Sequence, residues 1–216
     1  VSPGNGGVRR EVFFPGQAAG DPDFGLDPRA PVVVQPRGLR AYVRSDTFFR
    51  AIPLIRERLP EAVFVCPAME GAAEAEAWRT KLGLEGALRL LPALDAASMG
   101  ALFRRAAVSV SPSTHDGTPN TLLEAMACGC LPVAGDLASI REWIGDGENG
   151  LLVDPSDEQA LAGAVLRGLS DEGLRQRAAE VNRRLVAERA DYGACMAQAA
   201  SFYERVLRSG ADVDAL

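Results

Sequence analysis

The sequence is poor in the side chains that build metal centres and redox sites. It contains a single histidine, His115, and four cysteines, no two of which form a Cys-x-x-Cys pair. A zinc site would therefore be short of ligands. We predict that the cysteines are reduced, mostly buried thiols of a cytoplasmic protein. They are Cys66, Cys128, Cys130 and Cys195.

Three other features are missing. Basic residues are not in excess, because 23 basic and 29 acidic side chains give a net charge of −6; this argues against binding to nucleic acid or to an anionic membrane surface. No apolar run approaches the roughly 20 residues of a membrane span, and residues 1–7 lack a basic-then-apolar signal segment. The chain also lacks an initiator methionine, so we expect it to be cut from a longer protein.

The remaining composition favours one domain with a substantial core. The chain has 216 residues, of which 47% are apolar, and this is enough for one well-packed unit. Residues 1–30 are rich in glycine, proline and aspartate, and Val12-Phe13-Phe14 is their only apolar cluster. We expect residues 1–30 to be an extended lead-in docked by this cluster, residues 31–208 to form the domain, and residues 209–216 to be a flexible tail.

From Pro31 onward, short apolar runs alternate with amphipathic segments. Continuous runs such as Val32–Val34 are typical of strands buried on both faces. The alternation predicts an α/β fold: a doubly wound, parallel, six-stranded, Rossmann-like sheet with helices on both faces and a helical C-terminal segment. The strands are expected at residues 32–34, 63–65, 87–91, 108–110, 131–134 and 151–153.

The helices are placed by their periodicity and by their end signals. Pro60 is expected to end the first helix, and Ser156 with Gln159 to form a capping box. The helices are expected at residues 46–59, 72–82, 96–105, 119–128 and 137–144, and then from Ser156 to about Leu207 with breaks near Asp171 and Asp191.

The segment from His115 to Gly129 predicts a short helix with a packed back and a polar front. Thr118 is expected to be its N-cap, Pro119 its first helical residue, and Gly129 the residue just past its end. At about 100° per residue, apolar and polar side chains separate onto two faces. The apolar face holds Leu122, Leu123, Met126 and Ala127, and the polar face holds Asn120, Thr121 and Glu124.

The start of this helix is a candidate anion site. Its first backbone N–H groups have no partner within the helix and carry partial positive charge. Asp116 precedes the helix and Glu124 lies on its polar face, so two carboxylates flank a place where a phosphate could rest. An ordinary surface helix with one solvated side explains the same pattern.

The strand pattern places this segment at the binding edge of the sheet. In doubly wound sheets ligands bind beyond the carboxyl ends of the strands, and the segment follows the strand that ends at Val110. Arginines follow the strand that ends at Val34, in a chain that is otherwise acidic, and a cluster of guanidinium groups there suits a diphosphate. A solvated loop and helix face is the alternative. The arginines are Arg37, Arg40, Arg44 and Arg50.

The segment from Ser111 to Pro155 resembles the C-terminal domain of retaining nucleotide-sugar glycosyltransferases of the GT-B fold, family-4 type. That family carries Glu-x7-Glu within a phrase like PS…EG-PN-LLEAMACG-PV, followed by I-DG-NGLLV-P. Asp116 and Glu124 are eight residues apart, so aspartate takes the first glutamate position. The matching residues are Gly7-Val8, Val12-Phe13, Pro15, Ser111-Pro112-Ser113, Asp116–Asn120, Leu122–Gly129, Pro132-Val133, Ile144, Asp146-Gly147 and Asn149–Val153.

The resemblance implies a role for each part of the segment. Glu124 would accept hydrogen bonds from the ribose of the donor, and Asp116 would contact the transferred sugar. Backbone N–H groups at the helix start would hold the distal phosphate, and a glycine at 117 would let the backbone approach the sugar. The residues thus assigned to the donor are Gly117, Thr118, Pro119, Asn120, Thr121 and Leu122.

The resemblance also implies a basic pair on the diphosphate. The family uses an arginine and a lysine after the first strand, but this chain has no lysine there. Arg44 is the candidate for the lysine role, and either Arg37 or Arg40 is its partner; a guanidinium is a planar fork and not a point charge. The nucleobase would be held by backbone near Leu90 and Leu91, at the end of the third strand.

A GT-B enzyme has two such domains, with the acceptor-binding half first and the active site in the cleft between them. The chain matches the second half, so residues 1–30 would be the inter-domain lead-in and residues 31–208 the nucleotide-sugar-binding domain. We expect the donor half of a retaining hexosyltransferase that is inactive without the missing N-terminal acceptor domain. The donor would be UDP-, GDP- or ADP-linked, and neither a metal nor a cofactor would be required.

Two other functions are weighed against this one. A non-catalytic nucleotide-sugar-binding or partner-docking module would carry the same residues. A dinucleotide-binding oxidoreductase needs Gly-x-Gly-x-x-Gly after the first strand, whereas the sequence there is Gln35-Pro36-Arg37-Gly38-Leu39-Arg40. Of the neighbouring side chains, His115 is expected to face solvent or pack in its loop, and Ser113 and Thr114 to be turn residues.

Overall fold

Six parallel strands form one sheet in the order β3-β2-β1-β4-β5-β6. The structure is a computed structural model that describes residues 6–208. In the register, Val33 pairs with Phe64 of one neighbouring strand and with Val108 of the other. The predicted doubly wound parallel sheet is confirmed. The strands are β1 (Val32–Val34), β2 (Val63–Cys66), β3 (Leu88–Leu90), β4 (Val108–Ser111), β5 (Leu131–Gly135) and β6 (Leu151–Val153).

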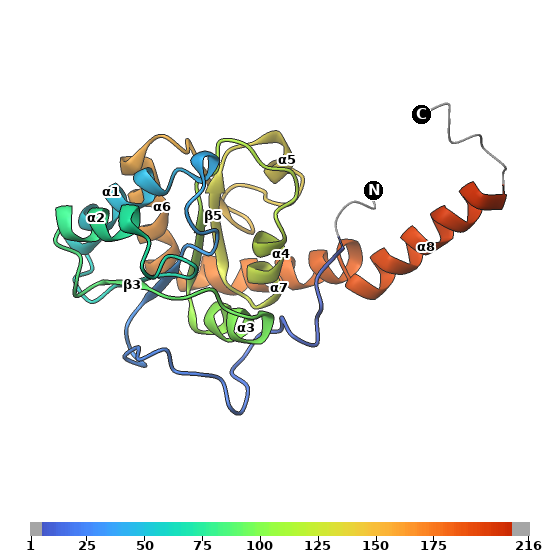
Figure 1. Cartoon of the computed structure of the whole chain (residues 1–216), viewed down its shortest axis with the longest axis horizontal. Helices are drawn as coiled ribbons and strands as arrows, with labels where there is room; N and C mark the ends of the chain where they lie inside the picture. Colours follow the sequence, from blue (N-terminus) through green and yellow to red (C-terminus); the bar gives the residue numbers. More distant parts are fainter. Residues whose placement is uncertain (1–5, 209–216) are drawn as a thin grey trace.

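Helices cover both faces of this sheet, and the breaks expected near Asp171 and Asp191 are present (Figure 1). A short 3-10 helix, η1 (Ala41–Val43), was not predicted. The α-helices are α1 (Ser45–Arg56), α2 (Ala73–Lys81), α3 (Ala96–Arg105), α4 (Asn120–Ala127), α5 (Ala138–Arg141), α6 (Glu158–Ser170), α7 (Glu172–Arg189) and α8 (Tyr192–Arg208).

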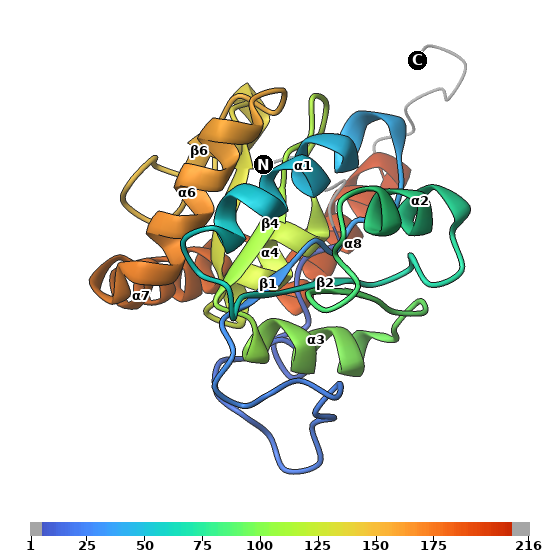
Figure 2. The same ribbon diagram turned by 90° about the vertical axis from the view of Figure 1, so that its left-hand side faces the viewer.

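The two faces of the sheet carry separate apolar layers because successive side chains of a strand point to opposite sides. Val33 packs with the aromatic side chains of α1, whereas Val32 and Val34 pack with the apolar side chains of α3 and α4. Figure 2 shows α1 and α6 on one side of the strands and α3 on the other. All three valines are fully buried, which is why the run has no polar residue.

Several predicted helix boundaries are wrong. The first helix ends at Arg56 and not before Pro60, since the amides of Arg58 and Leu59 both turn back onto the carbonyl of Ile55. The segment 137–144 is helical only over α5, and its last residues form a turn. At the start of α6, the side chain of Asp157 accepts from the amides of residues 159 and 160, so Asp157, and not Ser156, is the cap.

The lead-in, described from residue 6, docks as predicted but is a series of turns and not a continuous extended segment. Phe13 is buried against Phe103 of α3. Arg104 of α3 holds both oxygens of Asp21, at 2.9 and 2.6 Å. Its side chain is only 4% exposed, and this guanidinium lowers the pKa of Asp21. The amide of Val8 bonds to the carbonyl of Ala190, which joins the lead-in to the end of α7.

Two buried asparagines fasten α7 to the turn after α5. Asn149 donates to Asn182 at 2.7 Å and to the carbonyl of Trp143 at 2.9 Å, and accepts from the amide of Gly145. Asn182 donates in return to the backbone of Asn149. Because buried polar groups are costly without partners, this network fixes the Asp-Gly-x-Asn-Gly turn to the helix behind it.

The last helix, α8, extends away from the sheet (Figure 1). None of its described residues is buried, and its aromatic residues Phe202 and Tyr203 are exposed. The tail predicted at residues 209–216 lies outside the described residues. Within residues 6–208, no helix has the length and apolar character that crossing a membrane requires.

Candidate functional site

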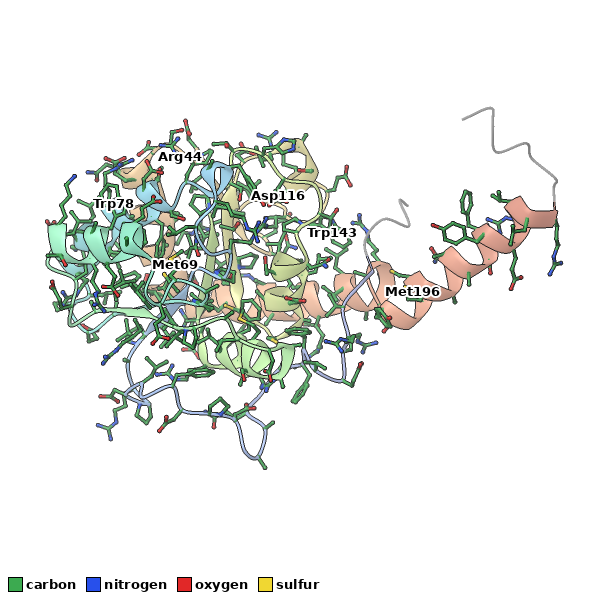
Figure 3. The ribbon with its side chains drawn as sticks, in the orientation of Figure 1. Arg44, Met69, Trp78, Asp116, Trp143 and Met196 are labelled. Carbon is green, nitrogen blue, oxygen red and sulfur yellow. The ribbon has the colours of Figure 1, made fainter. Side chains whose placement is uncertain are left out.

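The candidate site lies where the strand order reverses. β1 and β4 are neighbours, and the chain proceeds from them toward opposite ends of the sheet. In such sheets the crevice beyond the carboxyl ends of these two strands is the usual ligand site. The loop after β1 (residues 35–44) and the loop after β4 (residues 112–119) meet there, and Figure 3 shows Arg44 and Asp116 at this edge.

The loop after β1 is organised by the buried side chain of Gln35. Its amide nitrogen donates to Ser45 at 3.3 Å, and its oxygen accepts from the backbone of Arg37 at 3.2 Å. These bonds satisfy a fully buried polar group and tie the start of the loop to the start of α1. No sequence pattern around Gln35 predicts this role.

Arg37 is the predicted arginine that contacts the loop after β4. Its Nη1 lies 2.6 Å from a carboxylate oxygen of Asp116, and each side chain is only 12% exposed. Its Nη2 donates to the hydroxyl of Tyr42 at 3.3 Å, and the guanidinium lies 5.8 Å from the centre of that ring. The amide of Thr114 donates to the carbonyl of Tyr42 at 2.8 Å. Side-chain and backbone contacts together join the two loops.

Arg40 and Arg44 are placed differently. Arg40 is exposed, and among residues 6–208 its guanidinium donates only to the carbonyl of Arg37. Arg44 donates to both oxygens of Asp46 and to the hydroxyl of Ser156 at 2.8 Å. The hydrogen bonds from Arg44 hold the pKa of Asp46 well below its usual range. The structure therefore brings Arg37 to Asp116, while it engages Arg44 with the β6–α6 loop.

The loop that carries Asp116 is held from its other side by the segment around α5. Ser139 donates to the carbonyl of Asp116 at 2.6 Å, and the indole of Trp143 donates to Thr118 at 3.4 Å. Below the loop, a Cβ on Gly135 at the end of β5 would overlap the carbonyl oxygen of Ser113. Only a glycine at 135 lets the strand and the loop approach this closely.

The predicted helix of the segment is α4, but it begins one residue later than expected. Pro119 is the N-cap, with ψ of 124°, and its carbonyl accepts from the amide of Leu122. Thr118, the predicted N-cap, lies one residue before the observed cap. Within residues 6–208, the amides of Asn120 and Thr121 have no acceptor. These first amides of α4 are therefore free to bind an acceptor, and their predicted contact with a phosphate stays a prediction.

Glu124 lies on the polar face of α4, and its carboxylate is half-buried. Burial raises the pKa of Glu124, and the charge of Arg9 on the lead-in partly opposes this effect. No group among residues 6–208 donates a hydrogen bond to this carboxylate. The opposite face is buried as predicted, with Leu123 and Met126 in the core. A desolvated carboxylate without a donor is unfavourable unless a ligand supplies one.

Two other residues that were predicted to contact the nucleotide sugar have contrasting surroundings. Gly117 is exposed, and a Cβ there would meet nothing within 4 Å. The fold itself therefore does not require a glycine at this position. Leu91 donates its amide to Cys66, while its carbonyl accepts from Met69 and Glu70. Because the chain already uses both backbone groups of Leu91, the predicted backbone contact to a nucleobase is not supported.

The other side chains near the site take ordinary roles. His115 and Thr114 are exposed, as expected for His115. Ser113 is buried, with its hydroxyl 3.3 Å from that of Ser111. Cys66, Cys128 and Cys130 are free, buried thiols, and Cys195 is half-buried. Within residues 6–208, no group of three or more histidine, cysteine, aspartate or glutamate side chains could hold a metal ion.

Tyr42, Ser139, Trp143 and Ser156 are the contacts that sequence reasoning missed. Ser139, Trp143 and Ser156 each contact a residue far away in the sequence, and Tyr42, which lies close to Arg37 in the chain, also accepts from the amide of Thr114 on the other loop. Periodicity and spacing report only on local structure, so they carried no signal for these pairs. The one available indication was the parallel sheet itself, which places the loops after its strands at one edge.

Solved structures share this architecture. Sucrose-phosphate synthase from Thermosynechococcus elongatus superimposes with a TM-score of 0.84 at 22% identity, over 94% of this chain and 52% of that one. The Anabaena protein Alr3699/HepE, solved in complex with UDP and glucose, gives a TM-score of 0.80 at 20% identity, over 92% of this chain and 55% of that one. At these identities the likeness shows the fold.

The sequence itself matches a family and a curated relative. Phosphatidyl-myo-inositol mannosyltransferase of Mycobacterium tuberculosis is 34% identical over 169 residues, which are 76% of this chain and 44% of that protein. The chain thus spans less than half the length of this relative. The model of the family "Glycosyl transferases group 1" matches residues 31–171, which include both loops and α4. The chain belongs to the group 1 glycosyl transferases.

Proposed function

We propose that this chain is the donor-binding half of a retaining glycosyltransferase that transfers a hexose from a nucleoside diphosphate to an acceptor. The acceptor-binding half would be supplied by a separate N-terminal domain, because the chain spans 44% of its mannosyltransferase relative. The solved neighbour with bound UDP and the mannosyltransferase name of the relative support a nucleotide-hexose donor. Transfer would require both halves.

One observation carries the proposal: a half-buried carboxylate without a donor lies beside an open helix start. Within residues 6–208, the Glu124 carboxylate has no hydrogen-bond donor, and the amides of Asn120 and Thr121 have no acceptor. A nucleoside diphosphate satisfies both, since its ribose hydroxyls donate and its phosphate oxygens accept. An ordinary surface helix would leave its polar groups to water and would not bury the carboxylate.

The remaining residues would position the donor and stabilise the negative charge of its diphosphate. The distal phosphate would lie at the start of α4 with Arg37 beside it, and the sugar would pass over Gly117 toward Asp116. As the sugar–phosphate bond breaks, negative charge grows on the leaving diphosphate. Fixed guanidinium groups and helix amides would stabilise that charge, which is why the proposal needs no divalent metal. Arg44 would join them only after leaving Asp46 and Ser156.

Thermal unfolding in the presence of nucleotides tests this proposal. A ligand that binds only the folded chain stabilises it by RT ln(1 + [L]/Kd), so at least one of UDP, GDP and ADP at millimolar concentration is expected to raise the melting temperature progressively. The matching nucleoside, which lacks the diphosphate, is expected to raise it less. If none of the three diphosphates shifts the transition, the proposed donor site is wrong.

The affinity is also expected to depend on pH through Glu124. Only the ionised carboxylate accepts two ribose hydrogen bonds, and burial raises the pKa of this group from an ordinary value of 4.5. The gain in nucleotide affinity from Glu124 should therefore be lost at a higher pH than for an exposed glutamate as the solution is acidified. The stability of the ligand-free protein depends on pH in the opposite direction. As the pH rises, this buried carboxyl ionises, and its ionisation lowers the free energy of unfolding.

The comparison of wild type with Glu124→Gln isolates this effect. Titration of the terminal phosphate acts on both proteins alike and cancels in the ratio of their affinities. We expect that ratio to be largest near pH 7.5 and to shrink toward pH 4, which lies below the ordinary glutamate pKa of 4.5. A ratio that stays constant over this range would mean that the Glu124 carboxylate does not contact the ribose.

A further inference from the structure

The contact between Arg37 and Asp116 joins two groups to which the proposed function gives different partners. Arg37 faces the diphosphate and Asp116 faces the sugar, yet without a donor they lie 2.6 Å apart. Each is 12% exposed, so the contact is far from the fully solvated pairs that contribute almost nothing. A diphosphate that reaches Arg37 must therefore compete with this carboxylate.

The surroundings keep the two side chains together. The Tyr42 hydroxyl accepts a hydrogen bond from Nη2 of the Arg37 guanidinium at 3.3 Å. The side-chain oxygen of Gln35 accepts from the backbone amide of Arg37. On the other loop, Ser139 holds the carbonyl of Asp116 at 2.6 Å. Both backbones are thus anchored, and an aspartate, with a shorter side chain than glutamate, has little freedom to move aside.

Resting on the proposed function, we infer that Asp116 competes with the diphosphate for Arg37 and thereby determines how strongly the site prefers an intact nucleotide sugar over the free nucleoside diphosphate. With the intact donor, sugar hydroxyls donate to Asp116 and replace the bond that it loses when Arg37 turns to the phosphate. With the free diphosphate there is no sugar to replace it. The Asp116 carboxylate then pairs with Arg37 again and lowers the affinity of the site for the product, the free nucleoside diphosphate.

The variant Asp116→Asn tests the inference, with affinity measured for a nucleoside diphosphate and for its hexose conjugate. Asparagine keeps the size of the side chain but removes the charge that competes for Arg37. We expect the free diphosphate to bind about fivefold tighter, as for loss of one partly exposed ion pair. The conjugate should gain less, because a charged acceptor for its hydroxyls is lost, and so the preference for the intact donor should fall.

Asp136→Asn is the matched control for charge. Asp136 follows β5 at the same edge of the sheet and forms its ion pair with Arg141, at 2.5 Å, and not with Arg37. Its replacement removes the same charge, so it should change both affinities by less than about twofold and leave their ratio unchanged. If both variants tighten diphosphate binding equally, general charge repulsion is responsible and the inference is wrong.

Failure of the inference is distinguishable from failure of the proposed function. If the wild type binds neither ligand, both are wrong; if it binds both and Asp116→Asn leaves the free diphosphate unchanged or weaker, only the inference is wrong. Should the variant not fold, the carboxyl carbon of Asp116 can be followed by NMR in the wild type. Its signal should move when the free diphosphate saturates the site, and an unmoved signal would contradict the competition.

Discussion

Replacing Glu124 with alanine is expected to weaken nucleoside diphosphate binding about 10- to 100-fold. The carboxylate is half-buried, has no donor among residues 6–208 and lies next to the open start of α4. Each hydrogen bond to a charged group contributes about 1.5–3 kcal/mol, and about 1.4 kcal/mol is tenfold in affinity. Titration calorimetry on both proteins measures the difference. The exposed Glu188→Ala on α7 is the control, with wild-type affinity expected.

The same variant separates a binding role from a structural one. Removing a desolvated, unpaired carboxylate does not break a hydrogen bond in the free protein, so the melting temperature should stay the same or rise slightly at neutral pH. The apolar face of α4 carries the packing, and Glu124 is not on it. If Glu124→Ala instead loses its cooperative thermal transition, the residue supports the fold and α4 is an ordinary surface helix.

Replacing Gly135 with alanine is expected to be the most destabilising of the substitutions considered, by about 3 kcal/mol. The new Cβ would overlap the backbone oxygen of Ser113, and backbone cannot move aside as cheaply as a flexible side chain. Overpacking of this kind costs about 1–3 kcal/mol, and a loss of about 3 kcal/mol lowers the melting temperature of a chain of this size by about 6–12 °C. Scanning calorimetry measures the shift.

This variant should also impair nucleotide binding, because the displaced loop carries Asp116 and leads into α4. Gly163→Ala is the matched control. Gly163 is an exposed residue inside α6, and a Cβ there would meet nothing within 4 Å. Alanine favours a helix over glycine by about 0.5–1 kcal/mol, so the control should be slightly more stable. A Gly135→Ala protein as stable as wild type would show that the loop is not held against β5.

Local patterns in the sequence were sufficient to predict the sheet and the front of α4. Val32–Val34 is a fully apolar run because its two sides meet two different layers of helices. On α4, the apolar and polar stripes predicted from about 100° per residue match the buried and open sides of the helix. Both are short-range regularities, and each is recorded in adjacent residues.

Choices between neighbouring capping residues could not be predicted in the same way. Thr118 and Ser156 are both good caps by residue type, yet the structure uses Pro119 and Asp157. Tertiary contacts decide these cases. The hydroxyl of Ser156 accepts from Arg44, and that of Thr118 accepts from the indole of Trp143.

The pairing within the arginine cluster was open for a similar reason. Sequence spacing left Arg37 and Arg40 as equal partners for Arg44, since all three follow β1. The structure distinguishes them by what lies opposite: Asp116 and Tyr42 receive Arg37, whereas Arg40 remains exposed. For Leu91, by contrast, the sequence suggested a definite contact that the structure does not support. Its position at a strand end suggested a base contact, but hydrogen bonds from neighbouring turns already occupy its backbone.

The central claim is that the start of α4 and Glu124 form one nucleotide site, and mapping of backbone amide shifts tests it most directly. The chain is titrated with UDP, GDP and ADP while its amide signals are recorded. With at least one of them, the largest saturable changes are predicted from Asn120 to Glu124 and at Arg37. No change in that stretch with any of the three nucleotides, or changes confined to another surface, would contradict the account.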